Sequence, residues 1–150
     1  MAGCCCNSNV GPFSPILFYA TSPETPTGNL VGAGAVNVLT LGVSPPSPGQ
    51  HQVKLDSTVE LVLNKPGGAT LTYSIEYWLQ KDGANIAVLT ETGSFTVPNA
   101  AATYTLIPNL TWNDTITISV TYTVEIQVTT ITPAGTTVIA QTRALNAIVF

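Results

Sequence analysis

The stretch TITISVTYTVEIQVTT, residues 115–130, decides the fold of this chain. Its apolar residues stand at every second position, with Thr, Ser, Glu and Gln between them. Side chains of a β-strand alternate between two faces, so the pattern predicts one strand with a buried face and a solvent face. Such a long strand is expected to be central or covered by another chain, because an open edge pairs with any strand it meets. The buried face would carry Ile116, Ile118, Val120, Tyr122, Val124, Ile126 and Val128.

Period-two alternation continues over most of the chain from residue 34 onward. Turn clusters such as SPPSPGQ (44–50), NKPGG (64–68) and ITPAGTT (131–137) separate the alternating runs. We find no convincing helical window, so the sequence predicts an all-β antiparallel sandwich of about eight strands. A jelly roll is the first choice and an immunoglobulin-like sandwich the second. The other predicted strands are 35–43, 52–64, 69–80, 85–92, 93–98, 101–108 and 138–150; the faces predicted to be buried carry Val53, Leu55, Val59, Leu61 and Leu63 in 52–64, and Leu71, Tyr73, Ile75, Tyr77 and Leu79 in 69–80.

The first 33 residues differ from the rest and predict an extended connector arm ahead of a sandwich domain at 34–150. The arm is rich in proline, which removes ladder donors and favours extended conformations. It also contains one apolar patch, which either folds back onto its own domain or docks on a neighbouring subunit. This patch consists of Ile16, Leu17, Phe18 and Tyr19.

The chain carries very little charge. Only 8% of its 150 residues are charged, the net charge is −4, and four basic residues are scattered through it. A nucleic-acid or anionic-membrane surface needs clustered Lys and Arg, so both partners are excluded. A weakly charged surface rich in Thr, Ser, Asn and Gln instead favours association. The first residues lack the basic and long apolar regions of a secretory signal peptide.

Residues that could carry catalysis or hold a cofactor do not form a constellation. His51 is the single histidine and lies in a Pro/Gly loop, so we interpret it as a solvated loop residue. The acids are dispersed and lack calcium-loop spacing. Two glycosylation sequons begin at Asn109 and Asn113, which we interpret as loop residues. The chain is therefore predicted to be no enzyme, with no catalytic residue, metal site or cofactor.

All three cysteines, Cys4, Cys5 and Cys6, stand side by side near the N-terminus. Zinc ligation needs a second Cys or His pair, which the chain lacks. Adjacent cysteines rarely bond to each other, and the domain offers no partner. Intermolecular disulfides are therefore the leading interpretation. A reduced tag, a thiolate cluster pooled from several arms, and palmitoylation are the alternatives.

The N-terminal run Met-Ala-Gly-Cys-Cys-Cys-Asn, the Gly/Pro-containing arm and the Thr/Val-rich core resemble the pilins of bacterial endospore appendages. The resemblance implies jelly-roll subunits stacked by sheet augmentation and an N-terminal connector that cross-links them by disulfides. It also implies synthesis in the mother-cell cytoplasm, without a classical signal peptide. In that family the connector bonds to cysteines in neighbouring cores, whereas residues 34–150 contain none here. The partners would then be cysteines of other arms or of another protein.

The leading functional hypothesis is thus a structural subunit that assembles with copies of itself into an extracellular fibre on a spore or cell surface. Other fibre or spore-surface proteins are further partners to consider. A carbohydrate-binding or adhesin sandwich is the alternative from another class, with Trp78 on an outward face and Trp112 in a loop as its candidate aromatic residues. A viral capsid or fibre protein is a third reading of the same features.

Overall fold

The computed structural model describes residues 14–21, 25–68, 70–96 and 99–150. In these residues the chain forms β-strands joined by turns and loops, and none of it is a helix long and apolar enough to cross a membrane. The strands are β1 (Ile16–Thr21), β2 (Val36–Val43), β3 (His51–Lys65), β4 (Thr70–Lys81), β5 (Ala84–Thr96), β6 (Ala102–Leu106), β7 (Asn109–Ile116), β8 (Val120–Thr132) and β9 (Thr137–Val149).

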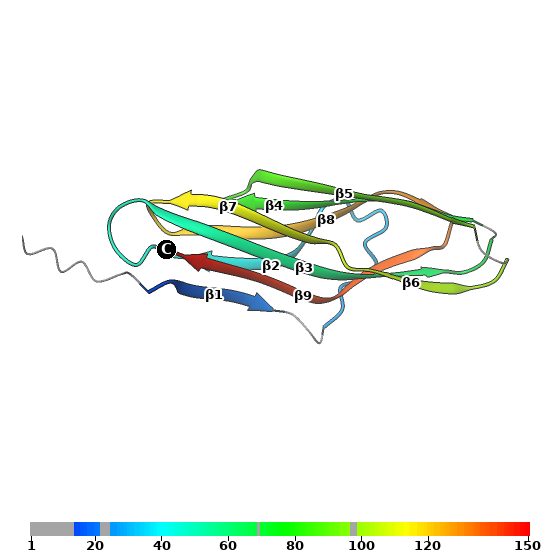
Figure 1. Ribbon diagram of the computed structural model, residues 1–150. Coiled ribbons are helices and arrows are strands. Elements are labelled where there is room, and N and C mark those ends of the chain that lie inside the picture. Colours follow the sequence, from blue (N-terminus) through cyan, green and yellow to red (C-terminus); the bar gives the residue numbers. More distant parts are fainter. Residues whose placement is uncertain (1–13, 22–24, 69, 97–98) are drawn as a thin grey trace, which may run out of the picture.

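The strands form two antiparallel sheets that pack face to face along the long axis of the molecule (Figure 1). The five-stranded sheet has the order β1-β9-β3-β6, and β7 also pairs with β3. The four-stranded sheet has the order β2-β8-β4-β5. β6 and β7 pair with successive parts of β3 and so act as one interrupted edge strand. This is the strand order of a jelly roll, which confirms the predicted fold class.

The core lies between the two sheets and is built from the predicted inward faces. Val53, Leu55, Val59, Leu61 and Leu63 of β3 are all buried, and the alternating residues of β4 from Leu71 to Leu79 face them from the other sheet. Burying a large aliphatic or aromatic side chain contributes about 1.5–3 kcal/mol, so these two rows, together with the buried rows of β8 and β9, stabilise the sandwich.

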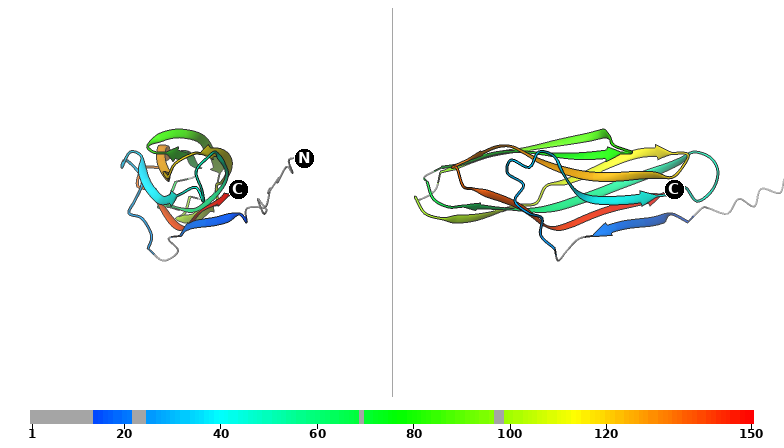
Figure 2. Two further views of the ribbon diagram at one scale, coloured as in Figure 1. Left: turned by 90° about the vertical axis from the view of Figure 1, so that its left-hand side faces the viewer. Right: turned by 180° about the vertical axis from the view of Figure 1, so that it is seen from behind.

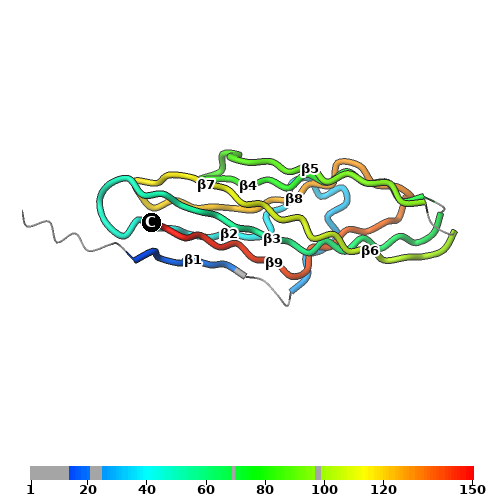
Figure 3. The backbone as a smooth tube through the Cα atoms, in the orientation of Figure 1, coloured from blue at the N-terminus to red at the C-terminus, as the bar shows by residue number. Residues whose placement is uncertain are grey.

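The single strand predicted over 115–130 is wrong, because the chain reverses in the middle of that run. Residues up to Ile116 end β7 on one sheet, residues 117–119 form a turn, and β8 begins at Val120 on the other sheet (Figure 3). The alternation hides this turn because Ile116 and Val120 are both buried, while Ile118 at the turn is 70% exposed. β8 itself is central, between β2 and β4, as expected.

Because of this turn, two substitutions of the same type are expected to change the free energy of unfolding by different amounts. Ile116→Val removes a methylene from the core and is expected to lower the free energy of unfolding by about 1 kcal/mol. Ile118→Val removes the same group from a solvent-exposed turn and is expected to change that free energy by less than about 0.5 kcal/mol. Urea titration of both variants measures the difference. Equal losses would contradict the turn at 117–119.

The structure joins the two strands predicted at 85–92 and 93–98 into β5 and places residues 16–21 of the predicted arm in the sandwich. Ile16 to Thr21 form β1, whose register on β9 runs from Ile16 opposite Val149 to Thr21 opposite Ala144. Further along, Thr27 and Leu30 donate backbone hydrogen bonds to β9. In the single chain the apolar patch is therefore part of a strand of its own domain.

Candidate functional site: the sheet edges

All four basic residues lie on strands that have neighbours on both sides. Lys54 and Lys65 are on β3, Lys81 is at the end of β4, and Arg143 is on β9. The edge strands β1, β2, β5, β6 and β7 contain no lysine, arginine or proline. Soluble proteins usually protect sheet edges with lysine, proline, very short strands or inward charges. The first two of these protections are missing from every edge of this sandwich.

The exposed large apolar side chains gather on the same edges. Six of them lie on edge strands and the other three in connections or at the chain end, while β3, β4, β8 and β9 carry none that the structure describes. Figure 2 shows β1 and β5 as outer borders of the molecule when it is viewed from behind. The six are Ile16, Leu17 and Tyr19 of β1, Val88 and Phe95 of β5, and Trp112 of β7.

The predicted docking patch is divided between two faces of β1. Ile16, Phe18 and Ala20 stand opposite Val149, Ala147 and Leu145, which are fully buried, so they face the sandwich interior. Leu17 and Tyr19 face outward and are 60% and 68% exposed. Half of the patch is thus used within the chain, and the other half remains accessible. Cys4, Cys5 and Cys6 lie outside the described residues, and their proposed cross-linking role stays a prediction.

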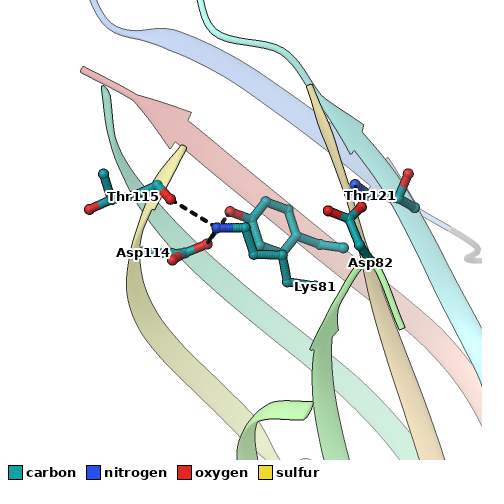
Figure 4. A network of polar contacts seen from close by, with 6 residues as sticks. Lys81, Asp82, Asp114, Thr115 and Thr121 are labelled. Atoms are coloured by element: carbon teal, nitrogen blue, oxygen red, sulfur yellow. Dashed lines mark hydrogen bonds and ion pairs between the residues drawn. The ribbon is translucent and has the colours of Figure 1, made fainter. Parts of the chain in front are cut away.

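A polar network at one end of the sandwich joins the two sheets, and sequence reasoning missed it. Lys81 at the end of β4 places its Nζ 2.7 Å from Oδ2 of Asp114 on β7 and donates to the Thr115 carbonyl at 2.8 Å (Figure 4). The Tyr122 hydroxyl donates to the same Asp114 oxygen at 2.7 Å. Lys81 is far from Asp114 and Thr115 in the sequence, and no local motif marks the network.

The environment of this network fixes its protonation. Burial alone would raise the pKa of Asp114, but hydrogen bonds from Lys81 and Tyr122 and the charge of Lys81 outweigh it, and the pKa lies below its ordinary value. Burial, and then the hydrogen bond to Asp114, raise the pKa of Tyr122. The carboxylate is therefore ionised and the phenol neutral at pH 7. The network is a neutralised link between the sheets.

The structure corrects the interpretation of His51 as a solvated loop residue. His51 begins β3 and is 7% exposed. Its Nδ1 is 3.1 Å from the Phe150 carbonyl oxygen and its Nε2 3.1 Å from that of Ser47. The ring is buried because the β2–β3 loop and the end of β9 close over it. These contacts give His51 a role in holding chain segments together.

The two tryptophans do not share a surface. Trp78 lies on the outward face of β4, where its Nε1 donates to Glu76 Oε2 at 3.1 Å. Trp112, predicted in a loop, is on β7 opposite the buried Leu55 and therefore faces the sandwich interior at an open edge. Asn109 and Asn113 are likewise on β7 and not in loops.

Among the described residues, no group of three or more His, Cys, Asp or Glu side chains could hold a metal ion. A shallow hollow lies at the end of the sandwich that carries Asp82 and Ser119. Ser44 Oγ and Ser119 Oγ are 2.9 Å apart at this place, and Asp82 Oδ1 accepts from the Thr121 amide. These polar groups therefore satisfy one another within the fold.

No protein-family model matches the chain, and no curated protein matches it. Among solved structures, the chain is similar to the VP2 subviral particle of infectious bursal disease virus, with 13% identity, a TM-score of 0.43, and coverage of 91% of this chain and 32% of that one. The T13 particle of the same virus gives 12% identity, a TM-score of 0.41 and coverages of 91% and 31%. Dimeric latent PorU from Porphyromonas gingivalis gives 12% identity and a TM-score of 0.42, and the match covers 89% of this chain and 12% of that one. The chain spans less than a third of the length of each.

Proposed function

We propose that this protein is a structural subunit that assembles with copies of itself into an extracellular fibre on a spore or cell surface. The observation that supports this most is the state of the sheet edges. They carry six of the nine exposed large apolar side chains that the structure describes and none of the basic residues. Edges of this kind pair with other strands through main-chain hydrogen bonds, which supply affinity without a side-chain pocket.

The sandwich has open edges on both of its long sides. β1 and β2 border one side, where they contact each other, and β5 and β6–β7 border the other. A contact between two different sides of the same molecule is heterologous and grows into a filament when the rotation between copies does not close a ring. The low net charge of −4 leaves little repulsion to oppose such growth.

Disulfides from the arm would make the assembly covalent. Ser14 lies two residues before β1 and eight residues after Cys6, so the Cα atom of Cys6 can lie at most about 29 Å from that of Ser14. Because the chain has no other cysteine, the bonds would join arms of different copies or an arm and another protein. The arm is thus proposed to lock contacts that the sheet edges form.

Electron microscopy of the purified full chain under oxidising conditions tests this proposal. Filaments are expected, together with a ladder of bands on a non-reducing gel that collapses to the 15.6 kDa monomer on reduction. The triple variant Cys4→Ser/Cys5→Ser/Cys6→Ser is expected to form filaments that dissolve in denaturant. Monodisperse monomers with and without reductant would contradict the proposal, and closed shells would favour the capsid alternative.

A further inference from the structure

We infer that β1 of one copy pairs with β7 of the next, so that the five-stranded sheet continues from subunit to subunit. This inference rests on the proposed function, and it names the two edges that meet. Both are edges of the same sheet, on opposite sides of the molecule. Direction, position along the sheet and the orientation of free backbone groups agree with this pairing.

The strand directions are compatible with a repeating contact. β1 is antiparallel to β9, β9 to β3, and β3 to β7. β1 and β7 therefore run in opposite directions within one molecule. A second copy added in the same orientation brings its β1 antiparallel to β7 of the first. Because this part of the sheet has an even number of antiparallel strands, β1, β9, β3 and β7, copies in the same orientation can continue the antiparallel pairing.

The two edges also lie at the same level along the sheet. Both β7 and the end of β9 that holds β1 pair with residues 51–58 of β3. Rows of register partners can be followed from one edge to the other without an offset. One row is Phe18, Ala147, Leu55 and Trp112, and the next is Tyr19, Asn146, Asp56 and Thr111. A neighbour displaced sideways would therefore meet β7 along the whole of β1.

The free hydrogen-bonding groups of the two edges match in this register. Phe150 donates its N–H to Gln52 of β3, so alternate residues back along β9 also face β3 and those between them face β1. On β1, Ile16, Phe18 and Ala20 stand opposite the residues of β9 that face β1, so their backbone groups are used in the β1–β9 ladder. Leu17 and Tyr19 keep their N–H and C=O groups on the free edge.

On β7, the Thr115 carbonyl accepts from Lys81 and so points to the free edge. By the same alternation, Asn113 and Thr111 point there too. In the unshifted register, Leu17 meets Asn113 and Tyr19 meets Thr111. The groups left free on one edge thus stand opposite the groups left free on the other.

Side chains favour β7 over the neighbouring edge β5 as the partner of β1. The inward face of β5 carries Glu91, opposite the buried Ile75, and an added strand would bury this charge. The inward carboxylate of β7 is Asp114, which Lys81 already neutralises. Trp112 is 39% exposed beside it, and Phe18 of the next copy would cover it.

Charge placement on the exposed pair Tyr19 and Thr111 tests the register. The double variant Tyr19→Lys/Thr111→Lys sets like charges directly opposite each other and is expected to raise the critical concentration for filaments about five- to tenfold. Tyr19→Lys/Thr111→Glu sets opposite charges there and is expected to restore assembly to near the wild-type concentration. Both positions are exposed, so circular dichroism should show the same folded monomer for each variant.

Two control variants carry the same added charge, with both or one of the new lysines on an edge other than β1 and β7. Val88→Lys/Thr90→Lys places it on β5 and is expected to leave assembly unchanged. Thr40→Lys/Thr111→Lys places one charge on β2, which borders the same side as β1, and is expected to behave as Thr111→Lys alone. Rescue by Thr40→Lys/Thr111→Glu in place of the Tyr19 pair would overturn the inference and assign β2 as the partner.

A cysteine trap gives a second readout that does not depend on filament morphology. In the Cys4→Ser/Cys5→Ser/Cys6→Ser background, mixing the single variants Leu17→Cys and Asn113→Cys is expected to give an oxidised dimer that neither variant forms alone. Wild-type protein that never assembles would sink the proposed function. Wild-type filaments whose assembly is indifferent to the Tyr19 and Thr111 charges, with no mixed dimer, would sink the β1–β7 pairing alone.

Discussion

Replacing Asp114 by alanine is expected to lower the free energy of unfolding by about 2–4 kcal/mol. The carboxylate accepts from Tyr122, which is fully buried, and lies 2.7 Å from Lys81 Nζ. Without it the buried hydroxyl loses its hydrogen-bond acceptor and the ammonium group loses its counterion. Since Lys81 ends β4 and Asp114 lies on β7, the loss also removes a link between the two sheets. Urea unfolding at pH 7 measures the effect.

The chain offers a matched control in its other ion pair. Lys54 Nζ and Asp56 Oδ2 are 3.3 Å apart on one strand, and both side chains are 40% or more exposed. Asp56→Ala is therefore expected to cost less than about 1 kcal/mol, since water screens such pairs. Equal losses for the two alanine variants would contradict a special role for the buried network.

The effect of Asp114→Ala should also depend on pH in a defined direction. The folded-state pKa of Asp114 is lowered, while the pKa of an aspartate in the unfolded chain is about 3.9. The unfolded chain therefore takes up the proton first as the pH falls. The stability that the ionised carboxylate contributes is complete above about pH 5 and is lost as the pH falls through the folded-state pKa. The difference between wild type and variant should shrink from pH 7 to pH 2, and a constant difference would argue against the ionised link.

Alternation in the sequence was enough to predict the fold class and most of the core. The inward rows of β3 and β4 were predicted residue by residue, because both strands are long, buried on one face and bounded by Gly/Pro turns. Tyr73, Tyr77 and Tyr122 were assigned to the core side by the same parity, and all three are buried. Local periodicity predicts these core residues because apolar side chains at every second position mark the buried face of a strand.

The failures occurred where a turn or a contact leaves no local signal. The turn at 117–119 has the sequence Thr-Ile-Ser, in which Ser119 is a weak turn former and the stronger signals Gly, Pro, Asn and Asp are absent. It also spans a number of residues that keeps Ile116 and Val120 in phase, so the alternation runs through it. As a consequence β7 was interpreted as a loop, and one of the two edges in the inferred contact could not be recognised.

The site itself depends on pairings between distant parts of the chain. That Lys81 neutralises Asp114, and that Leu17 and Asn113 share one row of the sheet, follows from register and not from spacing in the sequence. The absence of basic residues from edge strands is likewise invisible until the strand order is known. Composition indicated association, and the topology was needed to name the surfaces.

Gly93 gives the second large effect, and it lies inside β5, where the sequence predicted a boundary between two strands. Gly93 stands opposite Tyr73 in the register, and the Tyr73 ring lies over it. An added Cβ would be 2.5 Å from Cζ and 2.6 Å from Cε1 of that ring. The sequence prediction placed the boundary between the strands 85–92 and 93–98 directly before this glycine. In the structure it makes room for an aromatic side chain within a continuous ladder.

Gly93→Ala is therefore expected to lower the free energy of unfolding by about 2–3 kcal/mol, since the ring must leave its place. Tyr73 stacks on Phe95 with ring centroids 6.0 Å apart, and Phe95 stacks on Tyr104 at 5.2 Å, so near-ultraviolet circular dichroism should change as well. Gly42→Ala is the control, because a Cβ there meets nothing within 4 Å.

A double-mutant cycle identifies the Tyr73 ring as the cause. In a Tyr73→Leu background the methyl group of Gly93→Ala no longer meets an aromatic ring, and its cost should fall below about 0.5 kcal/mol. The two substitutions are then strongly non-additive. An undiminished cost in that background would mean that the backbone conformation at residue 93, and not the ring, requires glycine. Because that φ lies outside the left-handed region, the ring is the expected cause.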